Sequence, residues 1–287
     1  MRYATLRIDG VTRAARLSRR EFIVLDAPDV GTYLARGRVA RELDSIPFSL
    51  VEFAPLITRP AHIFCVGLNY VDHIAEMGRE EPEYPTLFGK FPSALLGPRD
   101  DLVLPECSSQ VDWEAELAVI VGQPLRNADV AEARRAIGGF SIANDVSMRD
   151  WQRRTLQWLQ GKTFEHTTPL GPLLVTPDEL DGAHALTVSC AVDGNVVQQG
   201  NTANLLFSPA ELLAYLSRIV TLQPGDVVLT GTPGGVGAAD PEQQGLVPGQ
   251  RLTTTIEGIG SCENLCVAPE KPALPRRLAV NGRRSQT

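Results

Sequence analysis

The chain has 287 residues, of which 43% are hydrophobic and 21% charged, and its formal net charge is −7. This length allows one or two domains with a buried core. No apolar run approaches the roughly 18–20 residues that cross a bilayer, and most of the acidic excess falls in residues 61–270. We therefore expect neither a membrane nor a nucleic acid as partner, because an acidic surface repels a phosphate backbone.

The cysteines and the first residues of the chain bear on the cellular compartment in which the protein is expected. The five cysteines are odd in number and scattered, and MRYATLRIDG has no secretory hydrophobic segment. Such a pattern is typical of a reducing environment. The expected location is therefore the cytoplasm.

Residues 1–58 form the first predicted unit, a small N-terminal domain. Its start, TLRIDGVTRAARL, indicates a β-hairpin that turns at Asp9-Gly10, and a modest helical stretch follows. Pro55 and Pro60 mark its end. The role of this domain is not evident from its residues.

Residues 59–270 form the second predicted unit, which is rich in short strands closed by Gly and Pro. Helices are few, and the clearest begins with Ser208 as N-cap, Pro209 at the first position and Glu211 at the third. The expected fold class is therefore α+β and β-rich, not a parallel doubly wound sheet. The tail, residues 271–287, has prolines, arginines and little apolar content, and we predict that it is disordered. The predicted strands are 61–69, 115–122, 185–197, 226–235 and 250–258, and a second helix is predicted over 129–137.

Two acidic residues stand at the entry to a predicted strand in VDWEAELAVIVG. Glu114 and Glu116 are two apart, so on a strand both side chains would share one face. Two carboxylates this close repel each other in a partly dry site unless a cation lies between them. A solvated strand edge with alternating acids is the competing interpretation.

A third carboxylate occurs in GGFSIANDVSMRDWQRR. Asp145 follows a short β-like run, and Arg149 and Gln152 come after it at a spacing that faces one way in a helical turn. Three carboxylates make an oxygen-only ligand set, which suits Mg²⁺ or Mn²⁺, and also Ca²⁺, better than zinc. Such a site leaves coordination positions for water and substrate oxygens.

The segment NYVDHIAEM predicts a short helix with Asn69 near its N-cap and Gly78 at its C-terminal end. His73 and Glu76 are three apart on it and would lie within hydrogen-bond reach. A carboxylate that orients an imidazole makes it a better general base. A plain surface pair is the alternative.

Lysine is rare in this chain, with three lysines against 24 arginines. Lys90 and Lys162 lie inside motif-like segments, where a compact ammonium is not replaceable by a guanidinium. The glycine-rich VVLTGTPGGVG lacks the Gly-Lys-Ser/Thr of a P-loop. We interpret it as a turn in which Thr232 and backbone N–H groups can receive an anion.

Taken together, these segments resemble the fumarylacetoacetate hydrolase family, in particular its shorter two-domain members. The most specific stretches are the E-x-E strand and NDVSMRDWQ, and the resemblance runs from about Ala61 to Val267. It implies a catalytic domain built as a mixed β-sandwich roll, a Mg²⁺ or Mn²⁺ cofactor and a homodimer. The stretches that carry it are GLNYVDHIAEM, LFGKFPSALLGP, VDWEAELAVIVG, GFSIANDVSMRDWQ, QWLQGKTFEHTTPLGP and LTGTPGGVG.

The resemblance also implies roles for residues. Glu165 and His166 depart from the family pattern, which often has an aspartate and then a threonine there, and the role of His166 stays open. The implied metal ligands are Glu114, Glu116 and Asp145; the catalytic residues are His73, Glu76 and Lys162; and the substrate-binding residues are Tyr70, Lys90, Arg149, Gln152 and Thr232.

The function expected from these parts is that of a metal-dependent hydrolase acting on a 2,4-dioxo acid such as an acylpyruvate or fumarylpyruvate, as in aromatic catabolism. A water activated by His73 and Glu76 would attack the distal carbonyl, and the cation would stabilise the enolate that leaves. The alternatives at the same site are an oxaloacetate-type decarboxylase and a 2-hydroxy-dienoate isomerase or hydratase. A non-catalytic oxo-acid-binding or metal-binding protein and a nucleotide-dependent oxidoreductase fit less well.

Overall fold

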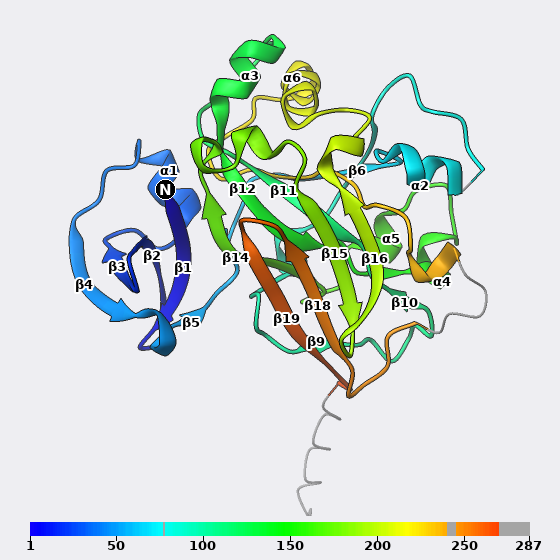
Figure 1. Ribbon diagram of the computed structural model, residues 1–287, viewed down its shortest axis with the longest axis horizontal. Coiled ribbons are helices and arrows are strands. Elements are labelled where there is room, and N and C mark those ends of the chain that lie inside the picture. The colour runs from blue at the N-terminus through cyan, green and yellow to red at the C-terminus, as the bar shows by residue number, and fades with distance from the viewer. Residues whose placement is uncertain (77, 240–244, 270–287) are drawn as a thin grey trace, which may run out of the picture.

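The structure is a computed structural model that describes residues 1–76, 78–239 and 245–269. In Figure 1 the N-terminal part lies at one side of the molecule and the remaining strands and helices at the other. The predicted disorder of residues 271–287 concerns a segment outside the described residues.

The N-terminal unit is a strongly twisted antiparallel sheet with one short helix. The predicted hairpin is present, with Asp9 and Gly10 at φ of 48° and 79°, the left-handed values that a two-residue hairpin turn requires. The predicted helical stretch corresponds to α1. The elements are β1 (Arg2–Ile8), β2 (Val11–Ser18), β3 (Glu21–Leu25), α1 (Val30–Ala35), β4 (Glu42–Pro47), the 3₁₀ turn η1 (Phe48–Leu50) and β5 (Glu52–Phe53).

The larger of the two main sheets continues from this unit, because β1 pairs with β14. Its strand order is β4-β3-β2-β1-β14-β12-β11-β17-β6-β7, with β5 beside β1 and β8 beside β14. The pairs β17–β6 and β14–β8 are parallel and the others antiparallel, so the sheet is mixed. The new strands are β6 (Ile63–Gly67), β7 (Thr86–Gly89), β8 (Leu95–Leu96), β11 (Ala115–Val121), β12 (Ile137–Asn144), β14 (Thr168–Val175) and β17 (Val227–Leu229).

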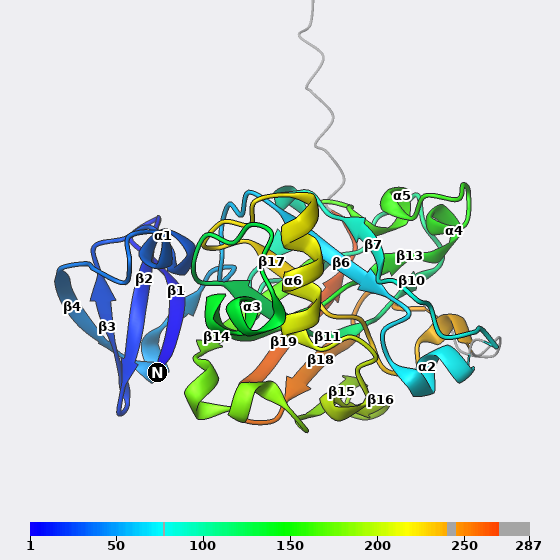
Figure 2. The same ribbon diagram turned by 90° about the horizontal axis from the view of Figure 1, so that it is seen from above.

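A second sheet of five strands, in the order β16-β15-β18-β19-β9, covers β11, β12 and β14 (Figures 1 and 2). A further short pair, β10 with β13, lies beside the carboxyl end of β12. The β-rich α+β fold class and the mixed sandwich predicted from the sequence are therefore confirmed. These strands are β9 (Leu102–Val103), β10 (Val111–Asp112), β13 (Ser147–Met148), β15 (Thr187–Val192), β16 (Asn195–Asn201), β18 (Arg251–Ile256) and β19 (Gly260–Val267).

The helices are short and begin where the sequence places capping residues. In α6 the Ser208 side chain accepts from the Glu211 N–H and Glu211 bonds back to Ser208, which is the predicted capping box. The α-helices are α2 (Val71–Glu76), α3 (Val130–Ala136), α4 (Arg149–Gln152), α5 (Leu159–Lys162) and α6 (Pro209–Ile219); the 3₁₀ turns are η2 (Pro92–Ala94), η3 (Pro177–Glu179), η4 (Asp181–Ala183), η5 (Thr202–Asn204) and η6 (Gly237–Ala239).

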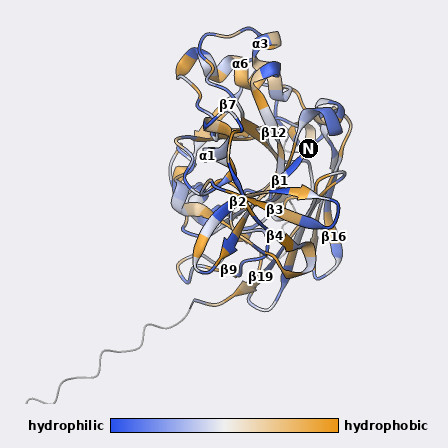
Figure 3. Ribbon diagram, turned by 90° about the vertical axis from the view of Figure 1, so that its left-hand side faces the viewer, coloured by the Kyte–Doolittle hydropathy of each residue, from blue (hydrophilic) through white to orange (hydrophobic). Residues whose placement is uncertain are grey.

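Strand β11 has both faces buried, which explains its unbroken apolar run. Leu117 and Val119 point to the core between the two sheets, and Ala118 and Ile120 to a second core on the other face. Hydrophobic and hydrophilic positions are interspersed along the strands and helices (Figure 3). No helix in the described part of the chain is long and apolar enough to cross a membrane.

Asp29 ties α1 to the segment that leaves the N-terminal unit. One carboxylate oxygen accepts from the Thr32 N–H at 2.7 Å, and the other accepts from the N–H and hydroxyl of Thr58 at 2.9 and 2.6 Å. Burial alone would raise the pKa of Asp29, but the hydrogen bonds from Thr58 and Thr32 outweigh it and the pKa is lowered.

We expect Asp29→Ala to lower the free energy of unfolding by about 1–2 kcal/mol, as for loss of an N-cap. Because the folded-state pKa of Asp29 lies below its unfolded value, this stabilisation is present above the unfolded pKa and is lost as pH falls through the folded one. Urea unfolding at neutral and acidic pH measures both effects. Asp29→Asn, which keeps an acceptor oxygen without the charge, should lie between wild type and Asp29→Ala; equal midpoints for all three would contradict the assigned role.

Candidate active site

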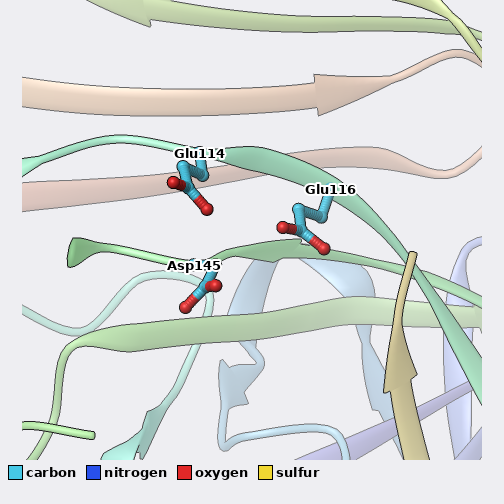
Figure 4. A group of neighbouring side chains, drawn as sticks. All are labelled: Glu114, Glu116 and Asp145. Atoms are coloured by element: carbon cyan, nitrogen blue, oxygen red, sulfur yellow. The ribbon is translucent and has the colours of Figure 1, made fainter. Parts of the chain in front are cut away.

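The antiparallel register of β11 and β12 brings three acidic side chains together. Ala115 pairs with Asn144, so Glu114 and Asp145 lie opposite each other one step further along, where the Asp145 N–H donates to the Glu114 carbonyl at 2.8 Å. Glu116 follows two residues after Glu114 and points the same way (Figure 4). A ligand oxygen from each of the three residues lies within 4.8 Å of the others, and all three side chains are buried.

Three cationic side chains contact this group of carboxylates. Lys162 Nζ donates to Glu114 Oε2 at 2.6 Å and to Asp145 Oδ2 at 2.9 Å, and Lys90 Nζ donates to Asp145 Oδ1. Arg149 pairs with Glu114 Oε1 at 2.6 Å. Both lysines that the sequence analysis singled out are therefore buried against the predicted metal ligands.

The pKa values of Glu114 and Glu116 are shifted in opposite directions. Burial would raise the pKa of Glu114, but Lys162 and Arg149 outweigh it and hold that pKa at about 2. Burial, followed by repulsion from Asp145 and Glu114, raises the pKa of Glu116 well above its ordinary value. Burial opposes the charge on Lys162, yet Asp145 and Glu114 raise its pKa, so this side chain stays an ammonium.

The donor set fits a divalent cation. All donors are carboxylate oxygens, the chemistry that Mg²⁺, Mn²⁺ and Ca²⁺ prefer. Glu116 is not ion-paired among the described residues; its hydrogen-bond donor there is the Gly231 N–H at 2.7 Å. Burial, together with repulsion from Asp145 and Glu114, raises the pKa of Glu116, and a bound cation would relieve that repulsion.

His73 and Glu76 form the pair that their spacing predicts on α2. His73 Nδ1 lies 3.0 Å from Glu76 Oε2, and the Gly235 N–H approaches both carboxylate oxygens of Glu76 at 3.3 Å. His73 is 9% exposed. Because Nδ1 faces Glu76, Nε2 is the ring nitrogen left to exchange a proton.

These groups share one cavity of about 650 Å³. Its lining includes most of the predicted site residues: His73, Glu114, Glu116, Arg149, Gln152, Lys162 and Thr232. Asp145 and Lys90 are buried outside this lining, and Asp145 accepts from both Lys90 and Lys162. The structure does not bring Tyr70 to the cavity wall; its side chain is fully buried.

The predicted substrate-binding side chains are held by neighbours. Arg149 NH1 donates to Gln152 Oε1 at 2.9 Å, as their spacing predicts, and Arg149 Nε donates to Asp112 at 2.7 Å. Thr232 donates to the Ala115 carbonyl and accepts from Gln198 Nε2 at 2.8 Å. Glu165 and His166 are exposed and do not line the cavity.

Several residues of the site were missed by the sequence analysis. Asp112 and Gln198 position Arg149 and Thr232 from distant parts of the chain, and nothing in their local sequence indicates this. Arg153 and Trp158, in contrast, lie in the cavity lining, and Arg153 follows directly on the predicted helical turn. Arg149, Gln152 and Arg153 have i, i+3, i+4 spacing, a signal that could have identified Arg153.

Comparison with known proteins defines the class of this fold and site. The family model for the fumarylacetoacetate (FAA) hydrolase C-terminal domain matches residues 62–267. The chain is 44% identical over 236 residues to a human protein named mitochondrial oxaloacetate tautomerase FAHD2A, covering 82% of this chain and 75% of that one. The chain belongs to the fumarylacetoacetate hydrolase family.

Solved structures agree with this assignment. A fumarylacetoacetate hydrolase from Exiguobacterium antarcticum superposes with a TM-score of 0.83 at 32% identity, covering 94% of this chain and all of that one. A 5-carboxymethyl-2-hydroxymuconate delta-isomerase from Mycobacterium smegmatis gives 0.79 at 31% identity with the same coverage. The resemblance is thereby confirmed, and the relatives include both hydrolases and isomerases. Whether this chain acts in the cytoplasm stays a prediction.

We expect Glu116→Gln to weaken Mg²⁺ binding more than tenfold while the protein stays folded, because an amide removes one anionic ligand and relieves repulsion in the metal-free site. Titration of Mg²⁺ against the metal-stripped protein, followed by the rise in Tm, measures this. Glu263→Gln, at an exposed position on β19, is the matched control. Equal Mg²⁺ affinity in wild type and Glu116→Gln would remove Glu116 from the ligand set.

Proposed function

We propose that this protein is a divalent-metal-dependent keto–enol tautomerase of a small 2-oxo acid, with oxaloacetate as the leading substrate. The observation that carries the proposal is that His73, which is paired with Glu76, lines the same cavity as Glu114 and Glu116. The identity to the human oxaloacetate tautomerase supports the choice of substrate.

Tautomerisation needs little from the protein, because one proton moves between carbon and oxygen and no bond between heavy atoms breaks. A cation held by Glu114, Glu116 and Asp145 would supply a Lewis acid that favours negative charge on substrate oxygens. His73, held by Glu76, is the proposed group that moves this proton: it takes the proton from C3 and delivers it to the 2-oxo oxygen, and it does the reverse in the other direction.

Lys162 has a different part in this proposal. As a stable ammonium with three N–H donors, it uses two on Glu114 and Asp145. The third is available to a substrate oxygen in the cavity that Lys162 lines. Arg149, fixed by Asp112 and Gln152, is a second donor, suited to a planar carboxylate.

Cleavage of a 2,4-dioxo acid, the hydrolase function predicted from the sequence, is the second candidate. It is favoured by the same oriented imidazole, which could activate a water as well as a carbon acid. Oxaloacetate decarboxylation is a third reaction of this chemistry, and it needs no base at C3.

Three assays on metal-stripped protein with added Mg²⁺ or Mn²⁺ separate these reactions. We expect faster loss of the ultraviolet absorbance of enol-oxaloacetate than without enzyme, no pyruvate in a lactate-dehydrogenase assay, and no cleavage of acetylpyruvate. Stoichiometric pyruvate from acetylpyruvate would establish the hydrolase instead. Pyruvate from oxaloacetate would establish a decarboxylase.

We expect His73→Ala to lower kcat for tautomerisation by about 10²–10⁴, the range for loss of a general base. Mg²⁺ affinity should stay near that of wild type, because His73 is not a ligand. Stopped-flow absorbance and Mg²⁺ titration measure the two quantities. His184→Ala, at an exposed position outside the cavity lining, is the matched control; equal loss of metal binding in His73→Ala would contradict the role.

A further inference from the structure

The arginine and lysine residues of the cavity lining fall into two groups. Arg149 and Lys162 pair with carboxylates at the buried end. Arg79 and Arg153 also line the cavity, but both are exposed, and neither is in an ion pair among the described residues. The cavity therefore has a cationic mouth that its own carboxylates do not neutralise.

Backbone hydrogen bonds hold both arginines at the ends of short helices. Arg153 directly follows α4, and its N–H donates to the Arg149 carbonyl at 3.2 Å. Arg79 follows α2: the Gly78 N–H donates to Ala75 and the Arg79 N–H to Ile74, the hydrogen-bond pair of a Schellman motif. Figures 1 and 2 place α2 and α4 at the same end of the molecule, opposite the N-terminal unit.

Part of the cavity wall is a closely packed aromatic surface. Trp158 packs so closely on Gly67 that a Cβ there would lie 2.4 Å from its ring, and it meets Phe88 edge-on with 5.5 Å between ring centroids. All three residues line the cavity. A short apolar part of a substrate would pack against this wall. The charged groups of the substrate would bind the cationic residues at the buried end and at the mouth of the cavity.

We propose that Arg153 and Arg79 bind the distal carboxylate of the substrate, so that the enzyme selects 2-oxo dicarboxylic acids over 2-oxo acids with an uncharged end. This inference rests on the proposed function for the reaction at the buried end. A guanidinium binds a carboxylate through two parallel hydrogen bonds, which gives direction as well as attraction.

The test compares oxaloacetate with its 4-methyl ester, which keeps the 2-oxo acid and lacks the distal charge. The Mg²⁺-loaded wild type, Arg153→Gln and Arg79→Gln are each assayed for tautomerisation and for binding by calorimetry. Arg154→Gln is the matched control, since the Arg154 guanidinium stacks on Trp151 at 3.5 Å and is not part of the lining.

We expect each cavity variant to lose about tenfold in kcat/KM for oxaloacetate, equivalent to ~1.4 kcal/mol, with the ester unchanged. The preference for oxaloacetate should also fall as salt is added, because exposed charges are screened. Equal losses for both compounds, or no preference in wild type, would overturn the proposal. If wild type turns over neither compound, the proposed reaction fails, and selective binding of the dianion, lost in Arg153→Gln, would still support the subsite.

Discussion

Ala115 pairs with Asn144 across β11 and β12, and this register decides which side chains meet at the ends of the two strands. A shift by one residue would turn Glu114 and Glu116 to the opposite face, because side chains alternate along a strand. The register is specified by apolar residues on both faces of β11, which fill two separate cores. The position of the carboxylates therefore follows from hydrophobic packing several residues away.

Bringing three carboxylates into a buried site is unfavourable without compensation, and much of the surrounding structure supplies it. Lys162 and Arg149 pair with the carboxylate of Glu114, and the Gly231 N–H donates to that of Glu116. Asn144 and Gln198 hold the backbone beside them, where they accept from the N–H groups of Glu114 and Ala115 at 2.9 Å. Asp112 in turn holds Arg149 while it accepts from the N–H groups of Gly237 and Ala238. Strands from both sheets and the glycine-rich loop thus contribute hydrogen bonds around the carboxylates.

The sequence predicted those parts of the site whose spacing is local. Glu114 with Glu116, His73 with Glu76, and Arg149 with Gln152 follow from the periods of strand and helix. The capping residues of α6 were also predictable from local sequence. Asp112 and Gln198 were not predictable, because their partners lie far along the chain and depend on strand pairing. Tyr70 and Lys90 were assigned to substrate from resemblance alone, and their burial away from the cavity wall depends on tertiary packing that no local pattern reveals.

The two buried lysines show why side-chain shape matters in a chain that otherwise uses arginine. Lys162 places one ammonium between Glu114 and Asp145, and Lys90 places another against the second oxygen of Asp145. A guanidinium is wider and directs its donors in a plane, so it could not make these bonds from either position without displacing a carboxylate. The guanidinium of Arg149, in contrast, uses several of its N–H donors at once, on Asp112, Glu114 and Gln152. Two compact ammonium groups therefore neutralise Asp145, whereas the planar guanidinium of Arg149 contacts Glu114 and is held in place by Asp112 and Gln152.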